Sequence, residues 1–392
     1  MYHPSLHLHN MTKPDFTLLR SGFDTVELAY RAALPDAFLD ALADAKIQAV
    51  KSRKPHPIEY AGQTFLVEGT GGQGGYAYRI STGPFGAIMK FREKGSNDAW
   101  GAHVKLRAYG LATKGILKAK AEADAFLLAV GGVFDPDDTR VGRVDYAMDF
   151  FAPNLVLNAS EFVAHAKMSK TELIEKTGNG DICNYLRIGK MPGKQICIYD
   201  KTKSVTETKD KIWFSIFEKE KKEKGLKNKG EKEISDIWRI EFRAGRDFLK
   251  KHLPLRRWDR FLAISNKVFL SLARAVAWRI PGSDTNRSRW ALHPIWEAVI
   301  AHLAEMNPLA EGKPISPEVL KLLREEYRAV LEAQVEGLLV TLAAFEGVSA
   351  GRLERSLDRA FDRTKRSISM RENLSDELAV RAARISMMFG GQ

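Results

Sequence analysis

The sequence is poor in cysteine and has no long apolar run. Its two cysteines, Cys183 and Cys197, and its lack of a secretory-type start predict a reduced, cytoplasmic protein rather than a disulfide-stabilised secreted one. No stretch of about eighteen apolar residues occurs, so no membrane span is expected. The sequence contains no G-x-S-x-G, and neither cysteine has a neighbouring histidine, which argues against serine and cysteine hydrolase chemistry.

Positive charge is in excess over negative charge. The 392 residues include 61 Lys and Arg against 49 Asp and Glu, giving a net charge of +12. Such a surface favours a polyanionic partner, of which nucleic acid is the commonest. The hydrophobic content of 44% is ordinary for a globular protein with a sizeable core, and the length predicts two or three domains.

The segment CNYLRIGKMPGKQICIYDK, residues 183–201, predicts a β-hairpin whose turn is GKMPGK. Alternation separates two faces, because successive side chains of a strand point in opposite directions. One face is aliphatic and carries Ile182, Leu186, Ile188, Ile196 and Ile198. The other face carries Tyr185, Arg187, Tyr199 and Lys201 with the two cysteines.

Two further segments, GRVDYAMDFF and DIWRIEFRAG, alternate in the same way. The first places Arg143, Asp145 and Asp149 on one face, and the second places Arg239, Glu241 and Arg243 there. If these strands share a sheet with the hairpin, its back is a core wall and its front gathers acids, arginines and tyrosines. The alternative interpretation is a solvated face with cross-strand ion pairs.

The order of these motifs resembles the replication initiation factor family, the trans-acting initiators of rolling-circle plasmids and their relatives in conjugative elements. The resemblance covers roughly residues 20–250 and rests on R-x-D-x-A-x-D, a hairpin closing on IYDK, and W-R-x-E. It implies that one DNA strand is cut by a tyrosine with a divalent metal, leaving a 5′-phosphotyrosine and a free 3′-OH. Arg187 stands where the family usually has its tyrosine, and Tyr185 lies two residues earlier on the same face.

The candidate nucleophile is Tyr185, with Tyr199 as the second choice. A phenol with a pKa near 10 attacks phosphorus only when it is deprotonated or polarised, and nearby cations assist both. Arg187 and Lys201 are therefore expected to hold the scissile phosphate.

The expected cofactor is Mg²⁺ or Mn²⁺, because carboxylates bind such ions and the ions neutralise phosphate charge. The predicted ligands are Asp145, Asp149 and Glu241, whose alternative role is ion pairing with the arginines. Further DNA contacts are expected from Arg143, Arg239, Arg243, Lys105 and Arg107.

The predicted fold class is α+β, with an antiparallel sheet, helices on one face and an all-α C-terminal domain. Residues 1–20 are expected to be a flexible leader, 21–253 the sheet domain and 254–392 the helical domain. The segment 159–178 is predicted to be a helix or helix pair opened by Ser160. Gly69, Gly71 and Gly74 satisfy G-x-G-x-x-G, but the strand-like YAYRI that follows predicts a hairpin turn instead of a dinucleotide site.

Three functions remain open from the sequence. The first is a rolling-circle initiator that nicks and rejoins DNA, and the second is a non-catalytic origin-binding or regulatory DNA-binding protein. An RNA-binding module would use the same aromatic and cationic sheet face but would not need three acids there. The expected partners are single-stranded or hairpin origin DNA and either a second copy of the chain or a replisome helicase.

The net charge of +12 generates a first prediction. The logarithm of the DNA affinity should fall linearly with the logarithm of the salt concentration, because bound phosphates release counterions. Single-stranded or hairpin DNA should bind at least as tightly as duplex, because the cut strand must be unpaired to enter the face. Fluorescence anisotropy in a salt series measures both, and a flat salt dependence would contradict this prediction.

Overall fold

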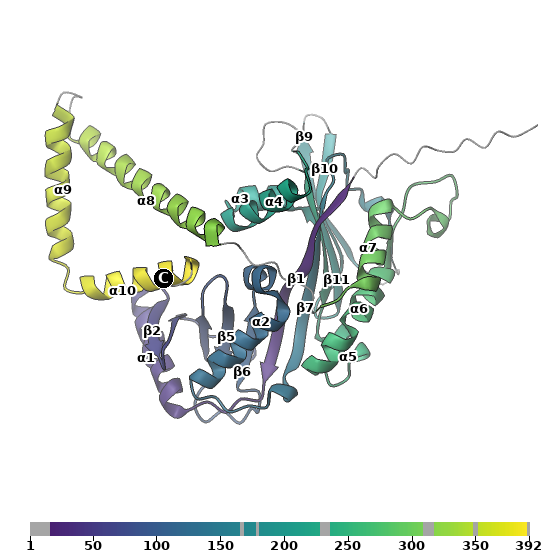
Figure 1. Cartoon of the computed structure of the whole chain (residues 1–392), viewed down its shortest axis with the longest axis horizontal. Coiled ribbons are helices and arrows are strands. Elements are labelled where there is room, and N and C mark those ends of the chain that lie inside the picture. Colours follow the sequence, from purple (N-terminus) through teal and green to yellow (C-terminus); the bar gives the residue numbers. More distant parts are fainter. Residues whose placement is uncertain are drawn as a thin grey trace, which may run out of the picture. The chain divides into compact units, whose positions relative to one another are not determined.

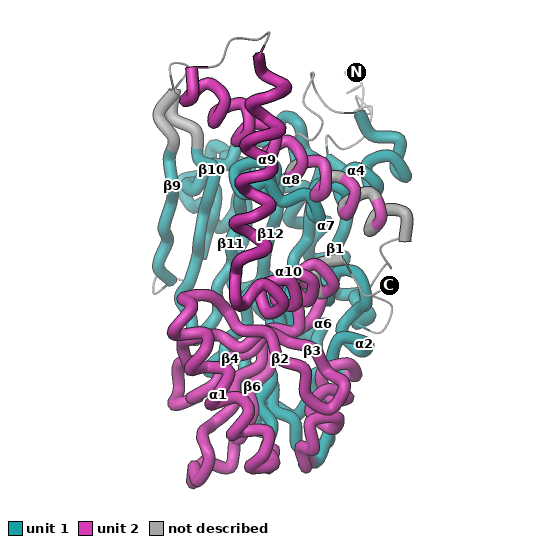
Figure 2. The backbone as a smooth tube through the Cα atoms, turned by 90° about the vertical axis from the view of Figure 1, so that its left-hand side faces the viewer, with its two compact units in different colours: residues 1–31, 105–120, 135–313 teal, residues 32–104, 121–134, 314–392 magenta. Residues whose placement is uncertain are grey.

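The chain divides into two compact units, shown in different colours in Figure 2. The computed structural model describes residues 16–164, 168–177, 180–227, 236–308, 317–347 and 352–389. Unit 1 comprises residues 1–31, 105–120 and 135–313, and unit 2 comprises residues 32–104, 121–134 and 314–392. This division differs from the predicted boundary after residue 253. Helices that follow that boundary join unit 1, and a block of the predicted sheet domain lies in unit 2.

Unit 1 is built on an antiparallel sheet with the strand order β1-β7-β12-β11-β10-β9. Its strands are β1 (Thr17–Tyr30), β7 (Arg140–Phe151), β9 (Lys170–Thr177), β10 (Gly180–Gly189), β11 (Lys194–Asp200) and β12 (Ile237–Ala244). Strands β1, β7, β9, β10 and β11 are labelled in Figure 1. The structure thus confirms that the predicted hairpin and the two flanking segments lie in one sheet. Residues 17–20, predicted to belong to the leader, are part of β1.

The back of this sheet is an apolar wall. Three helices of unit 1 follow β12, namely α5 (Arg246–His252), α6 (Trp258–Arg274) and α7 (Pro294–Glu305). Aromatic contacts hold α6 and α7 against the sheet. The ring centroid of Phe269 in α6 lies 5.3 Å from that of Tyr146 in β7, and the ring centroid of Trp296 in α7 lies 5.9 Å from that of Phe242 in β12. All four side chains are fully buried. Helices α6 and α7 therefore complete the core that the alternation of the strands predicts.

The segment 159–178 is not the predicted helix. It forms a 3₁₀ turn, η2 (Ala159–Glu161), then β8 (Phe162–Ala164) and, after residues 165–167, β9. Strand β9 pairs with β10 from Lys170 opposite Ile188 onward. Cross-strand hydrogen bonding to the following strand β10 has overridden the helical pattern, because propensity is only a weak determinant of structure. Strand β8 pairs with β13 (Val276–Trp278) in a small second sheet.

Two short helices, α3 (Lys201–Glu207) and α4 (Lys211–Glu223), follow β11. The Asp200 side chain accepts a hydrogen bond from the backbone N–H of Lys203, so it caps α3 and ends the strand. Lys201, expected at the end of the hairpin, is therefore the first residue of α3. Asp210 caps α4 in the same way by accepting from Trp213. The Lys/Glu-rich segment that follows Phe217 begins as the end of α4, and residues 228–235 lie outside the described ones.

Unit 2 has its own antiparallel strands, packed on a helix. They are β2 (His56–Tyr60), β3 (Gln63–Val67), β4 (Tyr78–Ser81), β5 (Ala87–Phe91) and the first part of β6 (Ala102–Leu106), adjacent in that order. The last two residues of β6 belong to unit 1. Phe38 of α1 (Asp36–Ser52) packs on the strands of unit 2, with its ring 5.3 Å from Phe91. The glycine-rich segment joins β3 to β4, so a strand follows it rather than a helix, as expected from the sequence.

The remaining helices are long. Helix α2 (Ala108–Ala129) passes from unit 1 into unit 2 and is interrupted at Gly115, whose φ of 75° lies in the left-handed region that glycine tolerates. Helices α8 (Pro317–Phe345), α9 (Leu353–Ser369) and α10 (Leu374–Phe389) form the C-terminal part of unit 2. The architecture is thus α+β with a helical C-terminal region, as predicted. Two details of the prediction are wrong: β13 lies within the segment expected to be all-α, and α4 packs through Trp213 on the sheet face opposite to the one that α6 and α7 cover. Among the described helices, none is both long and apolar enough to cross a membrane.

The core of unit 1 generates the second prediction. Trp296 is fully buried between Phe162 and Phe242, and its indole N–H donates to Val276 O at 3.0 Å. Replacing it by alanine should lower the free energy of unfolding by about 3–5 kcal/mol, because a large cavity and an unsatisfied carbonyl remain. Urea unfolding measures the loss. Leu255→Ala, at a side chain that is 65% exposed, is the control and should change stability by less than about 0.5 kcal/mol.

Candidate functional site

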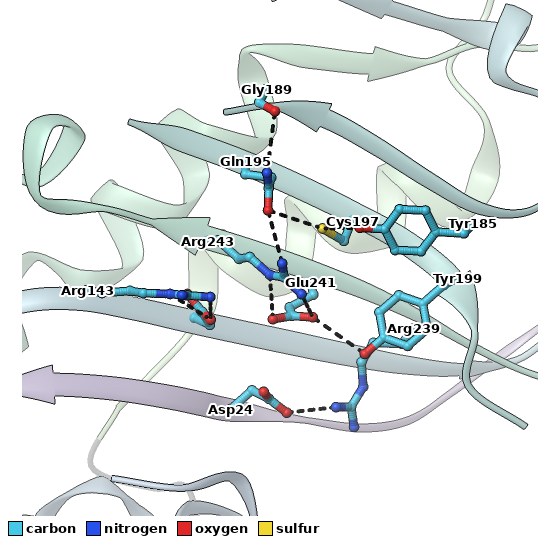
Figure 3. Close-up of polar contacts among 11 residues, drawn as sticks. Asp24, Arg143, Tyr185, Gly189, Gln195, Cys197, Tyr199, Arg239, Glu241 and Arg243 are labelled. Atoms are coloured by element: carbon cyan, nitrogen blue, oxygen red, sulfur yellow. Dashed lines mark hydrogen bonds and ion pairs between the residues drawn. The ribbon is translucent and has the colours of Figure 1, made fainter. Parts of the chain in front are cut away.

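The front of the unit 1 sheet carries a continuous set of polar side chains, which we call the polar face (Figure 3). It consists of Asp24, Arg143, Asp145, Asp149, Tyr185, Gln195, Cys197, Tyr199, Arg239, Glu241 and Arg243. The strand register brings its members together: Arg243 lies opposite Asp145, Tyr199 opposite Arg239, and Tyr185 opposite Tyr199. The structure thus confirms that Asp145, Tyr185, Tyr199 and Glu241 share one face.

Two arginines of the polar face each bind a carboxylate two residues along the same strand. Arg143 donates to both oxygens of Asp145, with Nε–Oδ1 at 2.9 Å and Nη2–Oδ2 at 2.6 Å. Arg243 does the same to Glu241, with Nε–Oε1 at 2.8 Å and Nη2–Oε2 at 2.9 Å. Such bidentate pairs are the strongest hydrogen-bonded ion pairs that side chains form.

The third arginine joins three strands. Arg239 of β12 binds Asp149 of β7 through Nε and Nη2, at 2.7 and 2.9 Å, and its Nη1 donates to Asp24 of β1 at 2.7 Å. The indole of Trp213 in α4 covers its guanidinium, which lies 4.5 Å from the ring centroid. Arg239 is therefore only 2% exposed, and its charge is offset by two acids and a ring face.

The carboxylates of the polar face are buried rather than accessible. Asp145, Asp149 and Glu241 are 1%, 2% and 3% exposed, whereas the sequence predicted an open face. Burial dominates at Asp145 and raises its pKa to about 7, although Arg143 opposes the shift. Burial also acts to raise the pKa of Glu241, but the hydrogen bonds and charge of Arg243 outweigh it and the pKa is lowered. The two acids thus differ in how strongly their arginines hold them charged.

The two candidate nucleophiles are half-buried neighbours. The rings of Tyr185 and Tyr199 lie 6.1 Å apart, on adjacent strands. The Tyr185 hydroxyl is 3.6 Å from Cys197 Sγ, and the Tyr199 hydroxyl donates to Glu241 Oε2 at 3.5 Å. Burial, together with Cys197, raises the pKa of Tyr185 to about 12, and burial raises the pKa of Tyr199 well above its ordinary value. Both phenols are therefore protonated at neutral pH.

The four cations expected to contact DNA outside the arginine pairs lie in different settings. Arg187 of β10 is half-buried and donates from Nη2 to Thr171 Oγ1 at 3.2 Å. Lys201 is buried under Trp213, 5.0 Å from its ring centroid, and burial lowers the pKa of its amine to about 8. Lys105 lies in β6, which β1 separates from β7 in the strand order, and Arg107 follows directly after β6.

The predicted metal ligands do not fit a divalent cation as they are arranged. Asp145, Asp149 and Glu241 each turn both carboxylate oxygens toward an arginine. Within the described part of the chain, no three His, Cys, Asp or Glu side chains are grouped so that they could hold a metal ion. An ion at this face would have to displace at least one guanidinium. This geometry matches the alternative role that the sequence analysis gave these three carboxylates, which is ion pairing with the arginines.

Three residues of the site were missed by the sequence analysis. Asp24 lies beside a register shift between Phe23 and Thr25, so simple alternation places it on the wrong face. Trp213 comes from a helix, and nothing in its local sequence predicts where that helix packs. Gln195 could have been found, because it lies two residues from Cys197 on the same strand. Its side-chain oxygen accepts from Arg243 Nη1 at 3.0 Å.

Comparisons with known proteins find little. No protein-family model matches the chain, and no curated protein matches it. A solved structure of a rolling circle replication initiator protein from Geobacillus stearothermophilus is similar over 76% of this chain and 99% of its own. The identity is 15% and the TM-score 0.41, values too low to carry an argument about fold or activity.

The buried arginine generates the third prediction. Arg239→Met should lower the free energy of unfolding by about 3–5 kcal/mol at neutral pH, because Asp149 and Asp24 lose their shared counter-charge. The loss should shrink as the pH falls, since burial raises the pKa of Asp24 and its protonation removes one of the uncompensated charges. Chemical denaturation at several pH values measures this.

Arg257→Met is the matched control, because Arg257 pairs with Asp259 at the surface, with side chains 36% and 49% exposed. The stability loss in Arg257→Met should be much smaller than that in Arg239→Met, because solvent screens an exposed pair. A loss at Arg239 as small as at Arg257, or one that does not depend on pH, would contradict a structural role for the buried pair.

Proposed function

We propose that this chain is a replication-initiator-type protein that binds DNA at the polar face and cuts and rejoins one strand there through Tyr185. The observation that carries the proposal is the register of β10, β11 and β12. This register sets Tyr185 opposite Tyr199, and Tyr199 opposite Arg239. The hairpin and W-R-x-E motifs of the initiator resemblance thus lie on neighbouring strands in their sequence order. A sheet face that served only solubility would need neither paired tyrosines nor buried arginines.

The reaction would be a transesterification. The Tyr185 oxygen bonds to phosphorus, the bond from phosphorus to the 3′-oxygen breaks, and that oxygen leaves with a proton as a free 3′-OH. The phenol must lose its own proton to attack, and Arg243 and Arg187 are the charges that act to lower its pKa. Cys197 is a poor base at neutral pH, because burial raises the pKa of its thiol to about 11. The half-buried phenol would therefore release its proton to solvent.

Charge on the phosphate would be neutralised by arginine. Arg187 is the best placed, since it is half-buried on the strand that carries Tyr185 and its recorded partner is a neutral hydroxyl. Arg243 would contribute through the donors that face Gln195 and Glu241. Lys201 is a poorer choice than the sequence indicated, because it is buried under Trp213. This arrangement uses guanidinium groups where the resemblance implies Mg²⁺ or Mn²⁺.

A second function, DNA binding without cleavage, is supported by a different observation. Each of the three predicted metal-binding carboxylates is held by an arginine, and Arg187 stands where the resemblance places tyrosine. Such a protein would recognise an origin or regulate its use. The two functions share the polar face and differ only in whether a covalent bond to DNA forms.

The fourth prediction separates them. A single-stranded oligonucleotide carrying the cognate origin should form a covalent adduct with the protein, seen as a band shift in denaturing gels. Tyr185→Phe should abolish the adduct while changing DNA affinity less than about twofold, because only the phenol oxygen is lost. Tyr199→Phe is the matched control on the neighbouring strand and should retain the adduct.

Each other outcome has a defined meaning. Loss of the adduct in Tyr199→Phe alone would move the nucleophile to Tyr199. Loss of the wild-type adduct in EDTA would show that a metal is required, against the arginine arrangement. No adduct from the wild type at its own origin, with DNA binding retained, would overturn the nicking proposal in favour of binding alone.

A further inference from the structure

A second group of cations lies outside the polar face, where residues 279–290 fold against β8 and the start of β9. Lys170 Nζ donates to the carbonyl oxygen of Phe162 at 2.6 Å and to that of Ala159 at 3.3 Å. Arg287 Nη2 donates to the same Phe162 oxygen at 3.3 Å. Two positive groups therefore converge on one neutral acceptor, and burial together with the Arg287 charge lowers the pKa of Lys170.

A third cation, Arg279, lies in the same loop. Its Nη1 donates to the carbonyl oxygen of Trp290 at 2.5 Å, and the guanidinium of Arg287 lies 5.6 Å from the Trp290 ring centroid. Both arginines thus contact Trp290, Arg279 through the backbone carbonyl and Arg287 through the ring. In the described part of the chain, the Nε atoms of Arg279 and Arg287 are buried side-chain donors without a hydrogen-bond partner. Buried donors are rarely left unpaired, so the pair indicates a missing acceptor.

The acidic side chains near this cluster have other hydrogen-bond partners. Glu161 accepts a hydrogen bond from the Trp278 indole at 2.9 Å, and Asp284 pairs with Arg289 at 3.5 Å. Glu172 acts on Lys170 only through its charge, which favours the protonated amine. None of the ion pairs recorded among the described residues joins an acid to Lys170, Arg279 or Arg287.

Hydrogen bonds within residues 284–290 hold this loop in a defined conformation without a ligand. The Trp290 indole donates to the Asp284 carbonyl at 2.7 Å, and Asn286 caps a 3₁₀ turn, η3 (Arg287–Arg289), by accepting from Ser288. Arg279 and Arg287 are half-buried, and Lys170 is exposed. An anion could therefore reach the three cations from solvent and find two of them already held in place.

We propose that Lys170, Arg279 and Arg287 bind a backbone phosphate of DNA. A phosphodiester offers charged acceptors for guanidinium donors, and phosphate contacts of this kind position a nucleic acid without reading its sequence. The proposal rests on the proposed function insofar as the anion is part of DNA. It adds a contact site that lies outside the polar face.

The position of Lys170 suits DNA that runs beyond the polar face. In β9, Lys170 lies opposite Ile188 and Thr171 opposite Arg187. Neighbouring residues of a strand point to opposite sides, so Lys170 turns away from the face that carries Arg187 and Thr171. DNA on that face at β10 would meet the edge strand β9 next and could continue around it to the three cations.

The test measures DNA binding as a function of salt. Arg279→Ala/Arg287→Ala should reduce the slope of log affinity against log salt by about 1 relative to wild type, because one phosphate contact is lost. Arg289→Ala is the matched control, an exposed arginine of the same loop that pairs with Asp284, and should leave the slope unchanged. An unchanged slope in the folded double variant would overturn the proposal. If that double variant still formed the covalent adduct with DNA, the proposed nicking function would stand although this phosphate site would not.

A second measurement uses the wild-type protein and so does not depend on how the variants fold. The arginine Nε–H signals of Arg279 and Arg287 should shift in NMR spectra when an oligonucleotide is added, and Arg289 should shift less. Inorganic phosphate is the second arm of the titration. Shifts with phosphate but none with DNA would identify a free-anion site and overturn the DNA assignment, and no shift with either would overturn the site itself.

Discussion

The pairing of buried arginine with buried carboxylate across β1, β7 and β12 is the constraint on which unit 1 depends. Arg239 is almost fully buried between Asp149, Asp24 and the ring of Trp213. Taking such a charge out of water costs several kcal/mol, and only complete pairing offsets that cost. The pairing therefore fixes the register of three strands and the position of α4 together. Removing one partner would leave an uncompensated charge in the core.

The same pairing decides what chemistry the polar face can support. A carboxylate that faces a guanidinium with both oxygens has little left to offer a metal ion, and Asp145, Asp149 and Glu241 are all in that position. In the proposed function, the groups that remain to contact a DNA strand are the two tyrosines at the β10–β11 pair and the arginines around them. Strand cleavage here would thus depend on a phenol and guanidinium groups. The cluster at Lys170 would add affinity without chemistry.

Part of this structure could be read from the sequence, because the side-chain period of a strand is two. That period placed Arg143, Asp145, Arg239 and Glu241 on one face correctly. It failed at Asp24, where a register shift reverses the alternation. The sequence pattern also predicted a helix where β9 lies, and this segment is a strand because it pairs with β10. The packing of Trp213 and the separation of residues 32–104 into unit 2 depend on long-range contacts that no local pattern encodes.

The most direct test of arginine as the partner of these acids is a crystal structure with manganese. Crystals grown with a single-stranded origin oligonucleotide and soaked in MnCl₂ give an anomalous map in which bound Mn²⁺ is unmistakable. If arginine holds the polar face, Asp145, Asp149 and Glu241 keep their bidentate partners and no anomalous peak lies within coordination distance of them. A manganese peak bridging Asp145 and Glu241, with Arg143 or Arg243 displaced, would contradict it.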